Sequence, residues 1–227
     1  DSASPGLMQV VFTFEGVEVP ASRYRCAQFF PHFERHGVAC GSIYGYGRLY
    51  NRLQRRPLLG PAYKLATRAK RGLLTVGVQG ADLLFHQRTA LPQTALPERL
   101  VARRGLPSIF DFDDSIFLGP GGAPSRCRER AFRDAVHLAD HCIAGNSYLA
   151  EVADAPDKTT VIPTVVDTGR YAPAREADSK ASGPVVIGWI GTPSNFPFLE
   201  RVVPALRAVL RERPEVRVRI VSSADFG

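Results

Sequence analysis

Three aspartates fall within four residues of the sequence, at Asp111, Asp113 and Asp114. They follow an apolar run, so we expect them at the carboxyl end of a strand, the edge of an open α/β sheet where ligands bind. Strand alternation would place Asp111 and Asp113 on one face and Asp114 near the loop. Carboxylates this close suit a general base, a substrate-hydroxyl acceptor or a metal ligand. An Asp that caps the next turn is the structural alternative, but one cap does not account for three residues.

The segment from Gly16 to Arg25 carries two arginines after the first predicted strand. We interpret Ser22 as a helix N-cap, which places Arg23 and Arg25 in the first helical turn. Cations there oppose the helix dipole at a cost of about 0.3–1 kcal/mol each, and a bound anion would offset this cost. Two solvated surface arginines, with Tyr24 packed beneath them, are an equally good interpretation.

A glycine turn follows a later predicted strand, in the sequence GWIGTPSN that begins at Gly188 and includes Gly191 and Thr192. Ser194 or Asn195 would cap the helix that follows. Backbone N–H groups of such a turn can approach a phosphate. The pattern is neither G-x-G-x-x-G nor a P-loop, so the motif alone is explained more simply as an ordinary capped helix.

The stretch 48–71 is strongly basic, with Leu and Tyr between the charges. One or two amphipathic helices, broken between Pro57 and Pro61, would fit this pattern. Such a helix could touch an anionic membrane surface. A solvated helix face is the commoner reason for a run of this kind, and it is our default interpretation.

The composition is that of an ordinary globular protein: 227 residues, 44% hydrophobic and 22% charged, with a formal net charge of +7. The basic surplus favours anionic partners. No nucleic-acid-binding motif is visible, so we expect no nucleic-acid partner. The four cysteines form no C-x-x-C pair, so we expect reduced thiols and no metal site.

Apolar runs alternate with segments of helical period, which predicts an α/β fold with a Rossmann-like parallel sheet. Strands are expected at 8–14, 38–43, 82–87, 107–112, 141–144 and 159–162. Pro31 is expected to kink the first helix.

A composition shift follows the sixth strand. We expect a first domain at 8–162, a linker rich in Pro, Gly and Ala at 163–184, and the beginning of a second Rossmann-like domain at 185–227. In this second part, strands are predicted at 185–190 and 216–221. The helix between them should bury the stripe Phe198, Leu199, Val202, Val203, Leu206, Val209 and Leu210.

Taken in order, several segments resemble family 4 ("group 1") glycosyltransferases of the GT-B fold. They include ADLLFHQR, LPSIFDFDDSIF, AGNSYLA, VIPTVVDTGRYAP and IGWIGTP. The resemblance implies an acceptor-binding domain followed by a domain that binds a nucleotide-diphosphate sugar. It also implies sugar transfer with retention, no metal and no cofactor, in a cytoplasmic protein that could lie at the inner face of the membrane. The acceptor could be a glycan, a lipid-linked molecule or a small molecule.

The resemblance also suggests positions for the site. Asp113 falls where many relatives carry a His, and Asp111 and Asp114 flank it. The expected acceptor-side residues are Gly16, Arg23, Arg25 and Arg88, and the expected donor-side residues are Gly191, Thr192, Ser194 and Asn195.

The later donor-site groups of that family are absent from these 227 residues. We therefore expect the second domain to be incomplete and the chain alone not to transfer sugar. Two alternatives stay open. One is a Mg²⁺-dependent phosphohydrolase that uses Asp111 as nucleophile and Asp113 as acid/base. The other is a non-catalytic binding domain.

Overall fold

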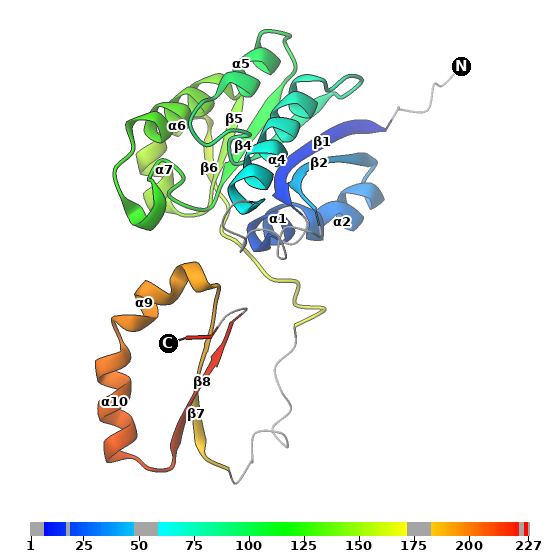
Figure 1. Ribbon diagram of the computed structural model, residues 1–227. Helices are drawn as coiled ribbons and strands as arrows, with labels where there is room; N and C mark the ends of the chain where they lie inside the picture. Colours follow the sequence, from blue (N-terminus) through cyan, green and yellow to red (C-terminus); the bar gives the residue numbers. More distant parts are fainter. Residues whose placement is uncertain (1–6, 17–18, 48–58, 172–182, 223–224, 227) are drawn as a thin grey trace. The chain divides into compact units, whose positions relative to one another are not determined.

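The computed structural model describes residues 7–16, 19–47, 59–171, 183–222 and 225–226 (Figure 1). The chain forms two units, residues 1–171 and 172–227. Of the predicted linker, residues 163–171 belong to the first unit, and 172–182 lie outside the described residues. The basic stretch 48–58 also lies outside them.

The first unit contains a six-stranded parallel sheet in the order β2-β1-β3-β4-β5-β6. Its strands are β1 (Met8–Gly16), β2 (Val38–Tyr46), β3 (Leu83–Gln87), β4 (Ser108–Phe112), β5 (His141–Ala144) and β6 (Thr159–Val161). This confirms the predicted Rossmann-like α/β class. The chain moves one way from β1 to β2 and the other way from β3 onwards. The switch point, where α/β sheets bind ligands, therefore lies between the carboxyl ends of β1 and β3.

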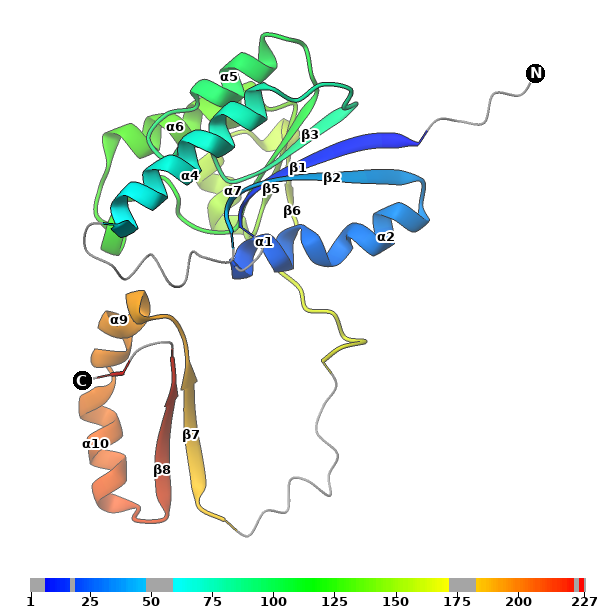
Figure 2. The same cartoon turned by 45° about the vertical axis from the view of Figure 1, so that its right-hand side comes forward.

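Helices cover both faces of this sheet, as Figures 1 and 2 show. The group α1 (Pro20–Arg25), η1 (Ala27–Phe29) and α2 (Phe30–Arg35) follows β1, and its Phe30 and Phe33 pack against Phe12. The other connections are α4 (Leu59–Val76), α5 (Leu96–Ala102), α6 (Arg126–Leu138) and α7 (Ser147–Ala153), with the short turns η2 (Pro120–Gly122) and η3 (Pro156–Lys158). The largest apolar cluster centres on Phe132 of α6, whose ring stands edge-on to Phe112 at 5.0 Å between centroids.

The first helix differs from the prediction. Val19, not Ser22, occupies the N-cap, and Ser22 is buried inside α1 with its hydroxyl donating to Gln87 Oε1 at 3.4 Å. The helix is interrupted after Arg25 by η1 rather than kinked at Pro31. Pro31 lies in the first turn of α2, where a missing N–H costs nothing.

The second unit pairs β7 (Val185–Ile190) with β8 (Val216–Val221) in parallel, with η4 (Pro193–Asn195), α9 (Phe196–Glu200) and α10 (Val203–Glu212) between them. Both strands have the predicted bounds. The predicted buried stripe is wrong except at Leu199, which is 3% exposed, whereas Phe198 is 60% exposed. Two strands offer too narrow a face to cover a helix stripe of that length.

All four cysteines are free thiols. Across the described ranges, no helix combines the length and apolar character needed to cross a membrane.

His86 on β3 is a titratable group in the centre of the first unit. It is 2% exposed, and its Nδ1 lies 3.5 Å from Thr13 Oγ1. Burial, together with the nearby charge of Arg71, lowers the pKa of His86 to about 3. The folded protein therefore holds this imidazole neutral at pH values where an unfolded chain would protonate it.

His86 should make the fold sensitive to acid. Its pKa rises from about 3 when folded to about 6.5 when unfolded. The free energy of unfolding is therefore not reduced by His86 above pH ~6.5. Below that pH it falls by about 1.4 kcal/mol per pH unit, because only the unfolded chain binds the proton. His86→Asn should flatten that dependence between pH ~4 and ~6.5 relative to the wild type, as measured by urea unfolding. Equal slopes for the two proteins would contradict this assignment.

Candidate functional site

Arg88 gathers three carboxylates at the switch point of the sheet. Its Nη1 donates to Glu15 Oε2 at 3.1 Å, and its Nη2 donates to Asp113 Oδ1 at 3.0 Å and also to Asp114. Glu15 ends β1, Arg88 follows β3, and Asp113 and Asp114 follow β4. The carboxyl ends of three neighbouring strands therefore supply one charge cluster, which we call the Arg88 cluster: Glu15, Arg88, Asp113 and Asp114.

The backbone of Arg88 is in the left-handed region, with φ of 62°. A non-glycine residue there carries a conformational cost, and such residues concentrate at functional sites. Its N–H donates to the carbonyl of Asp111 at 2.8 Å. Its own carbonyl accepts from Arg71 Nη2 at 3.2 Å. Both contacts hold the turn that aims the Arg88 side chain at the carboxylates.

Arg71 reaches this turn from α4 and is 3% exposed. Its guanidinium donates to the successive carbonyls of Gln87 at 2.7 Å, Arg88 at 3.2 Å and Thr89 at 3.2 Å. It also donates to the carbonyl of Thr13 on β1 at 3.3 Å. One buried cation thus fixes the ends of β1 and β3 relative to each other.

Asp111 pairs with Arg25 and not with the Arg88 cluster. Arg25 Nε lies 3.1 Å from both of its carboxylate oxygens, and a second guanidinium nitrogen contacts Oδ1. Asp111 is 1% exposed and Arg25 is 7% exposed. Burial raises the pKa of Asp111 to about 6, although Arg25 acts in the opposite direction. Phe112 ends the strand, and Asp113 pairs with Arg88, so the two aspartates that strand alternation would place on one face have different partners.

The two arginines of the first helix are not at its start. Because α1 is short, Arg23 and Arg25 lie in its last turn, where cations complement the helix dipole. The guanidinium of Arg23 stacks over the ring of Tyr24 at 4.8 Å. Each of the three guanidinium nitrogens of Arg25 donates to Asp111 or to the carbonyl of Ile162, which Nη1 contacts at 2.6 Å. The premise for an anion site at these residues is thus overturned.

Helix α1 and the adjoining turn η1 instead anchor the segment that follows β6. Besides Arg25, Gln28 Nε2 donates to the carbonyl of Val165 at 3.0 Å. The hydroxyls of Tyr24 and Tyr171 lie 3.2 Å apart. These contacts tie the start of the predicted linker to the first unit.

Two glycines permit close backbone approach around the site. A Cβ at Gly16 would lie 2.6 Å from the carbonyl oxygen of Tyr46. A Cβ at Gly145, after β5, would lie 2.9 Å from Cα of Asp113. Gly16 therefore packs the ends of β1 and β2 together, and Gly145 leaves room for the loop that carries Asp113.

Exposure separates the members of the Arg88 cluster. The side chains of Asp113 and Arg88 are 14% and 17% exposed, that of Glu15 is 26%, and that of Asp114 is 67%. Oδ1 of Asp113 accepts hydrogen bonds from Nε and Nη2 of Arg88. Within the described part of the chain, Oδ2 of Asp113 has no hydrogen-bond partner. An ionised carboxylate with one oxygen fixed and the other open can accept a ligand hydroxyl.

The predicted donor-side turn lies in the second unit, at Gly191 and Thr192. A Cβ at Gly191 would lie 2.5 Å from the ring of Trp189, so a side chain at this position would require that ring to shift. The N–H of Gly191 donates to the carbonyl of Val221 at 3.1 Å, and that of Asn195 donates to Thr192 at 2.9 Å. Ser194 lies in η4, between them. These facts fix the turn but do not test its ligand.

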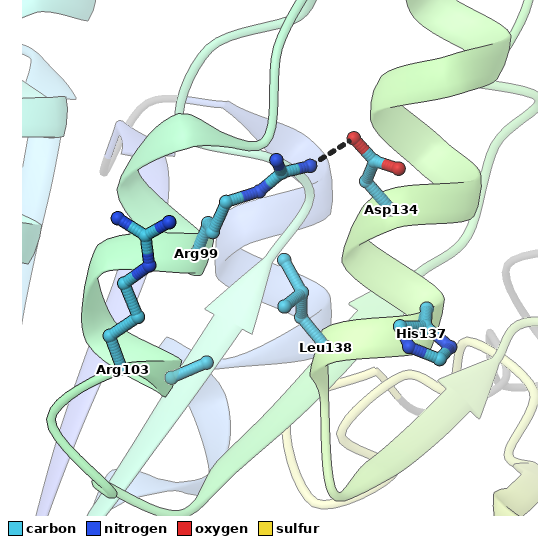
Figure 3. A pocket seen from close by; sticks show the side chains of 6 residues that line it. Arg99, Arg103, Asp134, His137 and Leu138 are labelled. Atoms are coloured by element: carbon cyan, nitrogen blue, oxygen red, sulfur yellow. Dashed lines mark hydrogen bonds and ion pairs between the residues drawn. The ribbon is translucent and has the colours of Figure 1, made fainter.

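A separate hollow of about 390 Å³ lies between α5 and α6, lined by Arg99, Ala102, Arg103, Asp134, His137 and Leu138 (Figure 3). Arg99 there donates to Asp134 at 2.8 Å. Both helices run antiparallel to the strands, and the hollow includes their last residues. It therefore lies toward the amino-terminal edge of the sheet, opposite the Arg88 cluster, and we assign it no role.

Sequence reasoning did not single out Glu15 or Arg71. Glu15 could have been found by the argument applied to the aspartates, because it directly follows a predicted strand and precedes a glycine. Arg71 had no such signal. It lies in a basic run that predicts a solvated helix face, and only the structure shows it buried.

No family model matches the chain. No curated protein matches it by sequence either. Solved structures do resemble it. UDP-GlcNAc 2-epimerase from Neisseria meningitidis, bound to UDP-GlcNAc, has a TM-score of 0.59 at 11% identity. The match covers 96% of this chain and 67% of the epimerase chain.

Two further structures resemble it similarly. A putative UDP-N-acetylglucosamine 2-epimerase from Listeria monocytogenes has a TM-score of 0.54 at 9% identity, covering 94% of this chain and 62% of its own. A glycosyltransferase from Rickettsia africae has a TM-score of 0.53 at 13% identity. The match covers 95% of this chain and 69% of the glycosyltransferase. The chain thus spans about two thirds of the length of these proteins. At these identities the likeness shows a shared fold, one found in enzymes of sugar nucleotides.

Asp111 and Asp114 should respond very differently to truncation. Asp111→Ala leaves Arg25 buried without its partner, and we expect it to lower the free energy of unfolding by about 3–5 kcal/mol. Asp114→Ala removes an exposed carboxylate and should cost about 1 kcal/mol or less. Urea unfolding of both variants checks this. Similar losses for the two would contradict the structural role of Asp111.

Proposed function

We propose that this chain contains the acceptor-side domain and part of the donor-side domain of a glycosyltransferase that uses a nucleotide-diphosphate sugar. The observation that carries the proposal is the Arg88 cluster at the switch point of a fold shared with sugar-nucleotide enzymes. The segments that resemble family 4 glycosyltransferases support it independently. Transfer with retention, without a metal or cofactor, is part of the proposal and rests on that resemblance.

Asp113 is the residue on which we place the acceptor. Its fixed Oδ1 and open Oδ2 suit a hydrogen bond from an acceptor hydroxyl, the group that attacks the donor sugar. Arg88 holds Asp113 in place and offsets the repulsion between the three carboxylates. Glu15 and the exposed Asp114 would bind further hydroxyls of the same acceptor.

On the donor side, we propose that the turn from Gly191 to Asn195 lies against the diphosphate. Gly191 keeps this turn free of a side chain, while its own N–H is used within the sheet. The contribution would therefore come from the backbone N–H of Ser194 and from polar side chains at the start of the helix.

A UDP-sugar 2-epimerase is the second candidate, because two of the three structures above carry that description. The two functions differ in their products. An epimerase converts a nucleotide sugar without any acceptor, whereas a transferase consumes an acceptor and releases the nucleoside diphosphate.

The phosphohydrolase alternative fits poorly. Its nucleophile would be Asp111, which is 1% exposed and has both oxygens against Arg25. A phosphate ester would have to displace that arginine to be attacked.

Saturation-transfer NMR with panels of nucleotide sugars, glycans and polyols tests the proposal. We expect acceptor binding that Asp113→Asn weakens about tenfold or more, since a hydrogen bond to a charged group is lost. The matched control is Asp134→Asn, a partly exposed carboxylate paired with Arg99 near the opposite edge. In any assay with turnover, the anomeric configuration of the product tests retention.

Three outcomes would contradict the proposal. One is the absence of binding by any sugar or nucleotide sugar. Another is equal effects of Asp113→Asn and Asp134→Asn. The last is conversion of UDP-GlcNAc to an epimer with no acceptor present, which would favour the epimerase.

A further inference from the structure

Helix α4 exposes its apolar residues and buries its polar ones. Leu65 and Leu73 are 71% and 75% exposed, and Leu59 and Leu74 are exposed as well. The residues that it buries are Gly60, Thr67, Arg71, Gly72 and Thr75. A surface helix of a globular protein normally has the opposite arrangement, with its apolar stripe against the core. Packing against the core of this unit therefore does not explain why these leucines are on the helix.

The exposed apolar residues form a continuous stripe. Ala62, Ala66 and Ala69 are exposed and share one helix face with Leu65 and Leu73 at helical spacing. We call this set, together with Leu59, the α4 stripe. A contiguous exposed apolar surface of this kind marks an interaction site more often than scattered single residues do.

The charges around the α4 stripe are all positive. Lys70 is exposed and Arg68 is partly exposed, and each lies three or four residues from a member of the stripe, whereas Lys64 lies beside the buried Gly60 and Thr67. No Asp or Glu occurs from Leu59 to Val76, nor anywhere else between residues 48 and 81. A helix with an apolar face, basic flanks and no acid has the composition of one that lies in the headgroup region of an anionic bilayer.

We propose that the α4 stripe binds the surface of a membrane containing anionic lipids, with the helix lying in the plane of the interface. Pairing with a second copy of this chain is disfavoured by charge. It would bring two sets of Arg68 and Lys70 together with no carboxylate on the helix to offset them. Anionic headgroups supply the missing charge, and the leucines and alanines enter the acyl boundary.

The first half of α4 lies beside the end of β2. The N–H of Gly47 donates to the hydroxyl of Tyr63 at 3.3 Å, and a Cβ at Gly45 would be 3.1 Å from the carbonyl of Thr67. This is the sheet edge that carries the Arg88 cluster. If the proposed transferase function holds, a lipid-linked acceptor would reach the cluster from this side.

Vesicle sedimentation without any sugar tests the membrane proposal separately from the transferase. We expect binding to phosphatidylcholine vesicles that contain about one third phosphatidylglycerol, and much weaker binding to phosphatidylcholine alone. Leu65→Glu with Leu73→Glu should reduce binding roughly tenfold or more. Lys70→Gln should reduce it about fivefold. The matched control is Tyr148→Glu on α7, a residue that is 56% exposed, which should bind like the wild type.

Circular dichroism of each variant should remain that of the wild type, because the substituted side chains lie at the surface. Equal binding to both vesicle types, or unchanged binding by the leucine variants, would overturn the proposal. So would a dimer in lipid-free buffer that Leu65→Glu dissociates, because the stripe would then be a protein interface.

Discussion

The buried guanidinium of Arg71 is the constraint on which the candidate site depends. It donates to three successive carbonyls after β3 and to one on β1, at distances of 2.7–3.3 Å. An unpaired buried carbonyl is costly, and so is a buried cation without acceptors, so each satisfies the other. The turn held in this way includes the left-handed backbone of Arg88, and from it the Arg88 side chain reaches carboxylates on two other strands.

A second arginine performs a similar task on the other side of β4. Arg25 of α1 holds Asp111 with its guanidinium and also the carbonyl of Ile162 beyond β6. The two neighbouring aspartates, Asp111 and Asp113, therefore have different partners and different exposures. Asp111 is part of the buried core, and Asp113 is partly exposed in the Arg88 cluster. The cluster of three acids in the sequence is thus divided by two arginines that come from distant segments.

The strands could be predicted because apolar runs with short polar breaks leave few alternatives in a parallel sheet. The bounds of β5, β7 and β8 were predicted without error. Residues whose environment depends on long-range contacts could not be predicted. Arg25 and Arg71 are arginines in polar segments, and their burial follows from acceptors that lie 86 and 58 residues away. The outward leucines of α4 were missed for the related reason that the helical period does not say which side faces the sheet.

The central claim is that Arg71 fixes the turn from which Arg88 holds the carboxylates. A double-mutant cycle of Arg71→Lys and Arg88→Met measures this coupling, with hydrogen exchange at the amides of β3 and β4 reporting the stability of the first unit. Arg71→Lys keeps the positive charge but loses the planar fork of donors. We predict a coupling energy of about 1 kcal/mol or more, because Arg88 contributes less once its turn is released. Additive effects within about 0.5 kcal/mol would contradict the claim.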